Sequence, residues 1–283
     1  MMPPVQAAFS HSSLSSFENC PRRYWFRYVR RIRVDREGIE AFVGKRVHEI
    51  LERLYRFVDQ GMVPSLPRVI WRYHQSFDEQ YREERVHIVR EGVGADFYRG
   101  LGVRCLANYY RRHYPFDGDE TLGLEEPIAF ALDPRGAYAV RGIIDRLVRA
   151  RDGALEIHDF KTGRRVPSQE ALDADRQLAL YELGVRSSLG ETGEVRLVWH
   201  YVLSDRVLTS RRTPDQLEGL RHAVQTLIDR IRGEREWEAR TGPLCGWCEY
   251  RDMCPAHGGV PPENDADTDA AVDAALELQL QLL

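Results

Sequence analysis

Asp159 and Lys161, separated by Phe160, have the clearest potential for chemistry in this chain of 283 residues. Of its 40 basic residues only Lys45 and Lys161 are lysines, and the others are arginines. Lysine is a compact ammonium with an adjustable pKa, so Lys161 is a candidate for a role that arginine cannot fill. On a strand, Asp159 and Lys161 share one face. Such a pair can hold a metal ion and orient a water, or it can be a surface ion pair.

Asp145 is a second carboxylate that the sequence pattern brings toward Asp159. It ends the apolar stretch 140–145, in the strand predicted just before the strand of Asp159. Adjacent antiparallel strands can bring both carboxylates to one ion, and hard cations such as Mg²⁺ prefer carboxylate oxygens. Gly142 permits close approach of another segment. The alternative for Asp145 is a strand-end residue paired with Arg146 or Arg149.

Three polar residues on predicted helices are further candidates. His48 lies in segment 44–52, where no second histidine completes a zinc-protease motif. A lone histidine on a helix is either structural or a metal ligand. Gln177 and Tyr181 are four residues apart and therefore share a helix face. They can hydrogen-bond a carboxylate or a phosphate, or they can form an ordinary polar helix edge.

Four cysteines form a candidate metal site. Cys245 and Cys248 have a C-x-x-C spacing, Cys254 follows them, and Cys20 lies near the other end of the chain. Four thiolates can bind Zn²⁺ or an iron–sulfur cluster, and the short spacing alone favours zinc. The alternative is that no metal binds. Cys105 lies in an apolar helical segment and is predicted to be an ordinary buried thiol.

Arginines and aromatic residues alternate near the N-terminus, although the net charge of the chain is -4. Bidentate guanidiniums bind phosphates and aromatic rings stack on bases, so this segment is a candidate nucleic-acid surface. The alternative is an amphipathic helix with its aromatic rings in the core. The candidate contact residues are Arg22, Arg23, Tyr24 and Arg27.

The hydrophobic pattern predicts an α/β protein without an internal repeat. Apolar periodicity predicts strands over 124–132, 137–149, 154–161 and 195–204. Helical spacing predicts helices over 13–28, 40–60, 168–189 and 214–233, with further helices within 68–114. No apolar run reaches the roughly 20 residues that span a bilayer, and no signal peptide is recognised. We therefore expect a cytoplasmic protein without a membrane partner.

Together these motifs resemble the PD-(D/E)XK nuclease superfamily, specifically its RecB-like branch with an iron–sulfur cluster. That branch includes the nuclease domain of AddB-type recombination subunits and the CRISPR-associated four-cysteine exonucleases. Ile144 stands where the superfamily's name has proline, a change that this branch tolerates. The matching motifs, in the family's order, are segments 12–24, 44–51, 142–145, 159–163 and 177–181 and the C-terminal cysteines.

The resemblance implies a restriction-endonuclease-like core, with a mixed central sheet flanked by helices, in one domain over 1–258. It also implies a helical insertion over 61–116. A C-terminal cluster segment over 234–258 would be joined to the N-terminal part of the chain by the iron–sulfur cluster. An acidic flexible tail over 259–283 is expected to follow.

The resemblance also assigns roles to the candidate residues. Lys161 would position or activate the attacking water, and Gln177 and Tyr181 would orient the site or the phosphate. The implied ligands of the catalytic Mg²⁺ or Mn²⁺ are His48, Asp145, Asp159 and the carbonyl oxygen of Phe160. The implied ligands of a [4Fe–4S] cluster, with zinc as the less expected occupant, are Cys20, Cys245, Cys248 and Cys254.

The implied activity is that of a metal-dependent DNA exonuclease, acting on single-stranded or processed ends in repair, recombination or CRISPR adaptation. The sequence has no phosphate-binding loop of the ATPase type, so a helicase or recombination subunit would be a separate partner. The alternative is a non-catalytic iron–sulfur subunit that binds nucleic acid within a helicase–nuclease complex.

Overall fold

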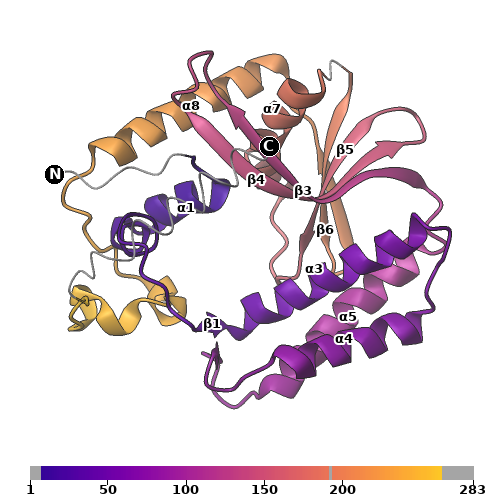
Figure 1. Cartoon of the computed structure of the whole chain (residues 1–283), viewed down its shortest axis with the longest axis horizontal. Coiled ribbons are helices and arrows are strands. Elements are labelled where there is room, and N and C mark those ends of the chain that lie inside the picture. The colour runs from indigo at the N-terminus through magenta and orange to yellow at the C-terminus, as the bar shows by residue number, and fades with distance from the viewer. Residues whose placement is uncertain (1–7, 191–192, 263–283) are drawn as a thin grey trace.

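The computed structural model describes residues 8–190 and 193–262, and a five-stranded mixed sheet forms its centre (Figure 1). The strands lie in the order β3-β4-β5-β6-β7; β5 and β6 are parallel, and the other neighbours are antiparallel. A helical crossover joins the parallel pair, as parallel strands require. The predicted α/β class with a mixed sheet is confirmed. The strands are β3 (Asp119–Ala131), β4 (Ala139–Ala150), β5 (Leu155–Lys161), β6 (Val195–Tyr201) and β7 (Arg206–Ser210).

Three helices lie on one side of the sheet (Figure 1). Helices α3 (Ile39–Val58) and α5 (Ala95–His113) pack against its face, and α4 (Leu66–Gln80) packs on these two helices. The helical stripe predicted over 40–60 is confirmed, because Val47, Ile50 and Leu54 are buried in this core. Phe160 of β5 packs into the same cluster. The short strands β1 (Glu37–Gly38) and β2 (Val86–His87) pair at the start of α3.

The opposite face is covered by α7 (Gln177–Leu189), with α8 (Pro214–Gly233) packed on α7. Leu178 and Tyr181 of α7 share a core with Leu155 and Ile157 of β5. Odd-numbered residues of β5 therefore face α7, whereas Phe160 faces α3 and α5. This alternation decides which side chains of β5 reach which helix.

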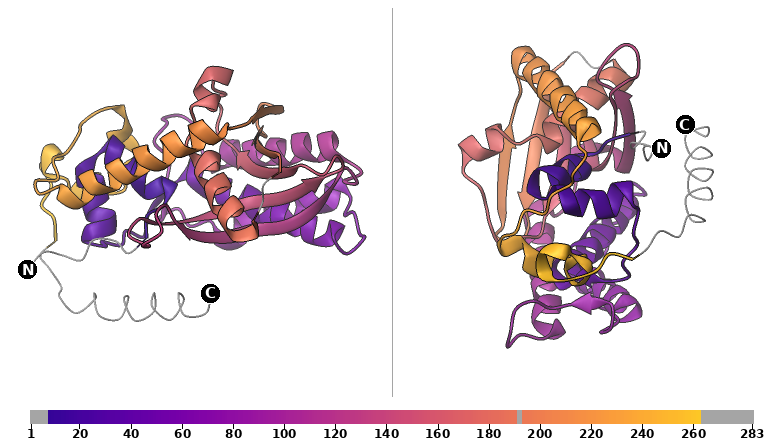
Figure 2. Two further views of the ribbon diagram at one scale, coloured as in Figure 1. Left: turned by 90° about the horizontal axis from the view of Figure 1, so that it is seen from above. Right: turned by 90° about the vertical axis from the view of Figure 1, so that its left-hand side faces the viewer.

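The two ends of the described chain lie together (Figure 2). Helix α1 (His11–Asn19) packs on α8, and the ring of Phe26 stacks on Tyr250 with centroids 5.3 Å apart. Three short 3₁₀ turns complete the C-terminal segment: Pro243–Trp247, Arg251–Met253 and Pro255–His257.

Two predicted helices are interrupted. The helix predicted over 13–28 stops at Asn19 because Cys20 is extended, with φ of -161°, before Pro21. Proline disfavours helical backbone in the residue before it. The chain continues as α2 (Pro21–Tyr24) and a π-helical turn over Trp25–Val29. The helix predicted over 168–189 is divided into α6 (Gln169–Asp173) and α7.

The end of the sheet differs from the prediction, and most of the predicted tail cannot be compared with the structure. Strand β7 was not predicted, and the strand predicted over 195–204 ends at Tyr201. Residues 263–283 of the predicted tail lie outside the described residues. Within the described part, no helix has the length and apolar character needed to cross a membrane.

Candidate active site

Lys161, Asp159 and Gln177 form a hydrogen-bonded triangle at the carboxyl end of β5. Lys161 Nζ lies 2.7 Å from Asp159 Oδ2 and donates to Gln177 Oε1, also at 2.7 Å. Gln177 Nε2 donates to Asp159 Oδ1 at 2.8 Å. Burial raises the pKa of Asp159, and the charge of Lys161 opposes that rise. The predicted shared face of Asp159 and Lys161 is confirmed, and α7 supplies the third member.

Asp145 lies where β4 separates from β5. The backbone N–H of Phe160 donates to Asp145 Oδ2 at 2.7 Å, so a side chain accepts the bond that a strand carbonyl would otherwise accept. Ile144 and Leu147 both pack in the core under α7, although residues three apart on a regular strand face opposite ways. The alternation of β4 therefore shifts here, and Asp145 points toward α3.

His48 of α3 completes the contact between helix and sheet. Its Nε2 lies 2.8 Å from the carbonyl oxygen of Phe160, which can only accept, so Nε2 carries the proton. Its Nδ1 lies 3.4 Å from Asp145 Oδ1 and 3.9 Å from Glu125 Oε1. Burial alone would lower the pKa of His48, but hydrogen bonds to Asp145 and Glu125 outweigh it and raise the pKa to about 10.

Glu125 is a candidate ligand that the sequence analysis missed. Ligand atoms of His48, Glu125 and Asp145 all lie within 4.8 Å of one another. One imidazole and two carboxylates suit a divalent cation such as Mn²⁺ or Mg²⁺, so these residues fit the predicted metal. Glu125 has φ of 47°, a left-handed conformation that costs a non-glycine residue free energy. The available signal was the pair Glu125-Glu126 inside an apolar strand.

Two of the predicted ligands have other partners in the structure. Asp159 is bonded to Lys161 and Gln177, and the group of mutually close ligand atoms does not include it. The carbonyl oxygen of Phe160 accepts the hydrogen bond from His48. The Phe160 carbonyl still adjoins the group formed by His48, Glu125 and Asp145, because the backbone of Phe160 bonds to His48 and Asp145.

A cavity of about 370 Å³ opens beside these residues. Its volume lies in the range of small-ligand sites. Lys45, the second lysine, lies on its rim and pairs with Glu37 at 2.6 Å. The cavity is lined by Gly44, Lys45, His48, Glu49, Glu52 and Glu125.

Tyr181 has a packing role in the described structure. Its side chain is buried, and burial raises its pKa to about 12. A Cβ atom at Gly142 would lie 2.3 Å from the ring of Tyr181, so only glycine fits there. The close approach predicted at Gly142 is thereby explained by Tyr181, which also lies one helical turn from Gln177.

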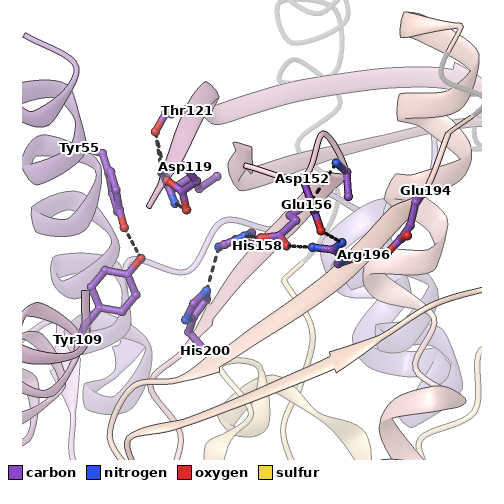
Figure 3. A network of polar contacts seen from close by, with 12 residues as sticks. Tyr55, Tyr109, Asp119, Thr121, Asp152, Glu156, His158, Glu194, Arg196 and His200 are labelled. Carbon is purple, nitrogen blue, oxygen red and sulfur yellow. Dashed lines mark hydrogen bonds and ion pairs between the residues drawn. The ribbon is translucent and has the colours of Figure 1, made fainter. Parts of the chain in front are cut away.

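A buried polar network supports β5 from the side of α3 and α5 (Figure 3). His200 Nε2 lies 2.9 Å from His158 Nδ1, and His158 Nε2 lies 2.9 Å from Glu156 Oε2. Burial lowers the pKa of both histidines. Arg146, the predicted alternative partner of Asp145, pairs with Asp119 instead. The carboxylate of Asp145 therefore contacts Phe160 and His48 and does not pair with Arg146.

The four predicted cysteine ligands line one small cavity of about 30 Å³. The backbone N–H of Arg240 donates to Cys20 Sγ, and that of Gly242 donates to Cys245 Sγ, both at 3.4 Å. Among residues 8–190 and 193–262, no three of these sulfurs lie within 4.8 Å of one another. Sulfurs bound tetrahedrally to zinc at about 2.3 Å would be closer together than that. Cys105 is buried in the core of α5, and burial raises its pKa to about 12.

The candidate nucleic-acid residues near the N-terminus all have partners within the protein. Tyr24 is buried and stacks on Trp237 with centroids 5.7 Å apart, so its ring is not available to a base. Arg23 and Arg27 both pair with Glu249, at 3.0 Å and 3.4 Å. Arg22 lies over the ring of Trp25, 5.1 Å from its centroid.

Comparisons with known proteins identify the family of this chain. A solved structure of a candidate exonuclease from Eubacterium rectale has 12% identity and a TM-score of 0.51, over 95% of this chain and 93% of that one. The solved structure of SSO0001 has 16% identity and a TM-score of 0.37, over 77% and 96%. No curated protein matches. The family model of the PD-(D/E)XK nuclease superfamily matches residues 8–255. The chain therefore belongs to the PD-(D/E)XK nuclease superfamily.

Proposed function

We propose that this nuclease is a metal-dependent DNA exonuclease of the RecB-like branch. One observation carries the proposal: ligand atoms of His48, Glu125 and Asp145 lie within 4.8 Å of one another, beside the triangle of Lys161, Asp159 and Gln177. A divalent ion bound there would lower the pKa of a water and neutralise charge on the scissile phosphate.

The residues of the candidate active site have distinct roles in this proposal. His48, Glu125 and Asp145 hold the Mg²⁺ or Mn²⁺, with Asp159 and the Phe160 carbonyl as the remaining candidate ligands. Lys161 orients the attacking water, because its side chain is 35% exposed while the position of its ammonium is set by Asp159 and Gln177. Gln177 bonds to both, so it positions the other two side chains.

A Lys161→Ala variant tests the proposed function. We expect it to lose cleavage of end-labelled DNA in Mg²⁺ or Mn²⁺ while retaining DNA binding and thermal stability. Arg111→Ala, an exposed change on α5, serves as the control and should cleave like the wild type. Cleavage by Lys161→Ala at the wild-type rate would refute the assignment. A wild-type protein that binds DNA without cutting it would instead favour a non-catalytic subunit.

We also propose that Cys20, Cys245, Cys248 and Cys254 bind a [4Fe–4S] cluster. Support comes from the one small cavity that all four cysteines line. Anaerobically purified protein should then be brown and contain iron and sulfide in equal amounts. A colourless protein loaded with zinc would reject the cluster and leave the nuclease proposal intact.

The remaining parts of the proposal concern organisation and partners. Residues 1–258 would form one nuclease domain, with 61–116 as a helical insertion and 234–258 as the cluster segment. The substrate would be a single-stranded or processed DNA end in the cytoplasm. A separate helicase or recombination subunit would supply that end, because the sequence has no ATPase loop of its own.

A further inference from the structure

Phe97 and two arginines form an exposed cluster that the roles assigned so far leave unused. Phe97 lies in the first turn of α5 and is 39% exposed. The guanidinium carbon of Arg164 lies 5.3 Å from the ring centroid, and that of Arg90 lies 5.7 Å from it. Both arginines are exposed. Two segments that are distant in the sequence, residues 90–97 and the chain after β5, therefore present one aromatic and cationic surface.

The cluster lies next to the candidate active site. Arg164 follows Lys161 by three residues, directly after β5 ends. A Cβ atom at Gly44, a residue that lines the active-site cavity, would lie 3.2 Å from Thr162 Oγ1. The chain that leaves the candidate catalytic lysine thus passes the cavity wall and then reaches Phe97.

The two guanidiniums retain their capacity to bind an anion. Within residues 8–190 and 193–262, neither Arg90 nor Arg164 has a carboxylate within 4.0 Å or a hydrogen-bond acceptor. Arg23, Arg27 and Arg112, in contrast, are each paired with a carboxylate. A guanidinium over an aromatic ring gains only a modest cation–π stabilisation, so its N–H donors stay available for phosphate oxygens.

The position of Phe97 within this cluster is fixed by its packed neighbours. Tyr98, the residue after Phe97, is buried in the core of α3 and α5, and the two rings pack edge to face with centroids 5.3 Å apart. A position on a packed helix restricts Phe97 more than a position on a loop would. The ring therefore needs little ordering when it binds a flat ligand.

We propose that Phe97, Arg90 and Arg164 form a subsite for a single nucleic-acid strand beside the point of cleavage, a proposal that rests on the proposed nuclease function. A base stacks on the cluster formed by the ring and the guanidiniums, and the arginines bind the neighbouring phosphates. Stacking on an aromatic ring needs an unpaired base, whereas phosphate contacts alone do not. The subsite would therefore make the enzyme favour single-stranded ends.

The test measures binding in EDTA, where cleavage cannot occur. The probes are fluorescein-labelled oligothymidylate and an abasic strand of the same length, which keeps the phosphates and lacks bases. Phe97→Leu should weaken oligothymidylate binding roughly fivefold or more and leave abasic binding nearly unchanged. Arg164→Gln and Arg90→Gln should weaken both probes, and each should reduce the salt slope by about 0.7 per lost phosphate contact.

Matched controls separate the subsite from general effects of the substitutions. Trp71→Leu removes another exposed aromatic, on α4, and Arg111→Gln removes another exposed arginine, about 21 Å from Phe97 along α5 at 1.5 Å per residue. Neither control should alter binding. Phe97→Trp should bind at least as tightly as the wild type, which excludes misfolding as the cause of the loss in Phe97→Leu.

Two outcomes would overturn the proposal. One is unchanged oligothymidylate binding by Phe97→Leu; the other is an equal loss for both probes, which would indicate a structural effect. If the wild type shows the expected binding pattern yet never cleaves DNA in Mn²⁺, the subsite stands and the nuclease proposal fails. The two proposals therefore fail in distinguishable ways.

Discussion

The candidate active site and the cysteine cavity differ in how the chain builds them. The active-site residues lie on a packed helix and on central strands, and they bond to one another: His48 to Phe160, Phe160 to Asp145, and Gln177 to Asp159. The cysteines lie before a proline and on short 3₁₀ turns, where backbone N–H groups are their bonded neighbours. The first site is organised by the fold before any ion binds.

This difference predicts which of the two sites needs its bound metal in order to fold. Regular elements with buried partners hold side chains in place without help from a ligand. Short turns have few internal hydrogen bonds, and a metal that binds a folded set of thiolates contributes its binding free energy to folding. We therefore expect loss of the divalent ion to abolish catalysis at the candidate active site without unfolding it. Loss of the cysteine-bound metal should instead unfold the cysteine segment.

Asp145→Asn should have the largest effect, because the carboxylate both faces His48 and accepts the Phe160 N–H. Metal-dependent cleavage should fall by at least about 100-fold while the protein stays folded. Kinetics with end-labelled DNA at saturating Mn²⁺ measure the loss. Asp205→Asn, an exposed aspartate paired with Arg112, should cleave normally. Equal rates for Asp145→Asn and the wild type would remove Asp145 from the site.

Cys20→Ser should lower the thermal stability of the cysteine region. Loss of a cluster ligand should cost several kcal/mol, or about 10 °C in Tm at 2–4 °C per kcal/mol for a domain of this size. Limited proteolysis should then cut first within 234–258. Cys105→Ser, a thiol outside the cavity, should retain the iron. An unchanged Tm and an unchanged iron content in Cys20→Ser would contradict the proposed cluster.

The pH dependence of metal binding should reveal the state of His48. Its pKa of about 10 means that the imidazole is protonated at neutral pH and must lose a proton to bind a metal. Mn²⁺ affinity should therefore rise about tenfold per pH unit below that value. Calorimetry in buffers of different ionisation enthalpy measures the proton release. A flat affinity profile would exclude His48 as a ligand.

The same shift predicts a change in the stability of the metal-free protein. The folded pKa lies above the unfolded value of 6.5, so the stabilisation is fully present below pH 6.5 and is lost as pH rises through about 10. Urea unfolding in EDTA should show the difference between wild type and His48→Gln shrinking over that interval.

Glu125→Gln should have the smallest effect, because its oxygen is the more distant carboxylate neighbour of His48, at 3.9 Å. We expect Mn²⁺ affinity to fall about tenfold, with a smaller loss at saturating Mn²⁺. Titration of cleavage against Mn²⁺ measures both quantities. Glu126→Gln, the adjacent residue on β3, is the matched control. If both substitutions act alike, Glu125 has no special role.

Much of the architecture could be predicted from the sequence. The strands that carry Asp145 and Asp159, and the helix stripe around His48, follow from apolar periodicity. Helix 214–233 was predicted with its observed bounds, because Pro214 begins it, and in the structure Thr213 caps it. Local rules suffice where the residues themselves set the start, the end and the buried face.

Other features required the folded structure. Cys20 and Pro21 divide the first helix, and the break places Cys20 at the same cavity as the C-terminal cysteines. The shift in the alternation of β4 near Asp145 was not evident from its pattern. Glu125 was missed because its left-handed backbone, and therefore the direction of its side chain, depends on the neighbouring strand.

By itself, the sequence determined the chemistry available to this protein: two acids and a rare lysine at strand spacing, one histidine on a helix, and four cysteines near the two ends. The tertiary structure alone decided which of them meet. It placed Glu125 against His48, turned Tyr24 inward, and brought Phe97 to Arg164. The physical reason is that residue type and local periodicity act within a few residues, whereas distances between side chains depend on packing across the whole core.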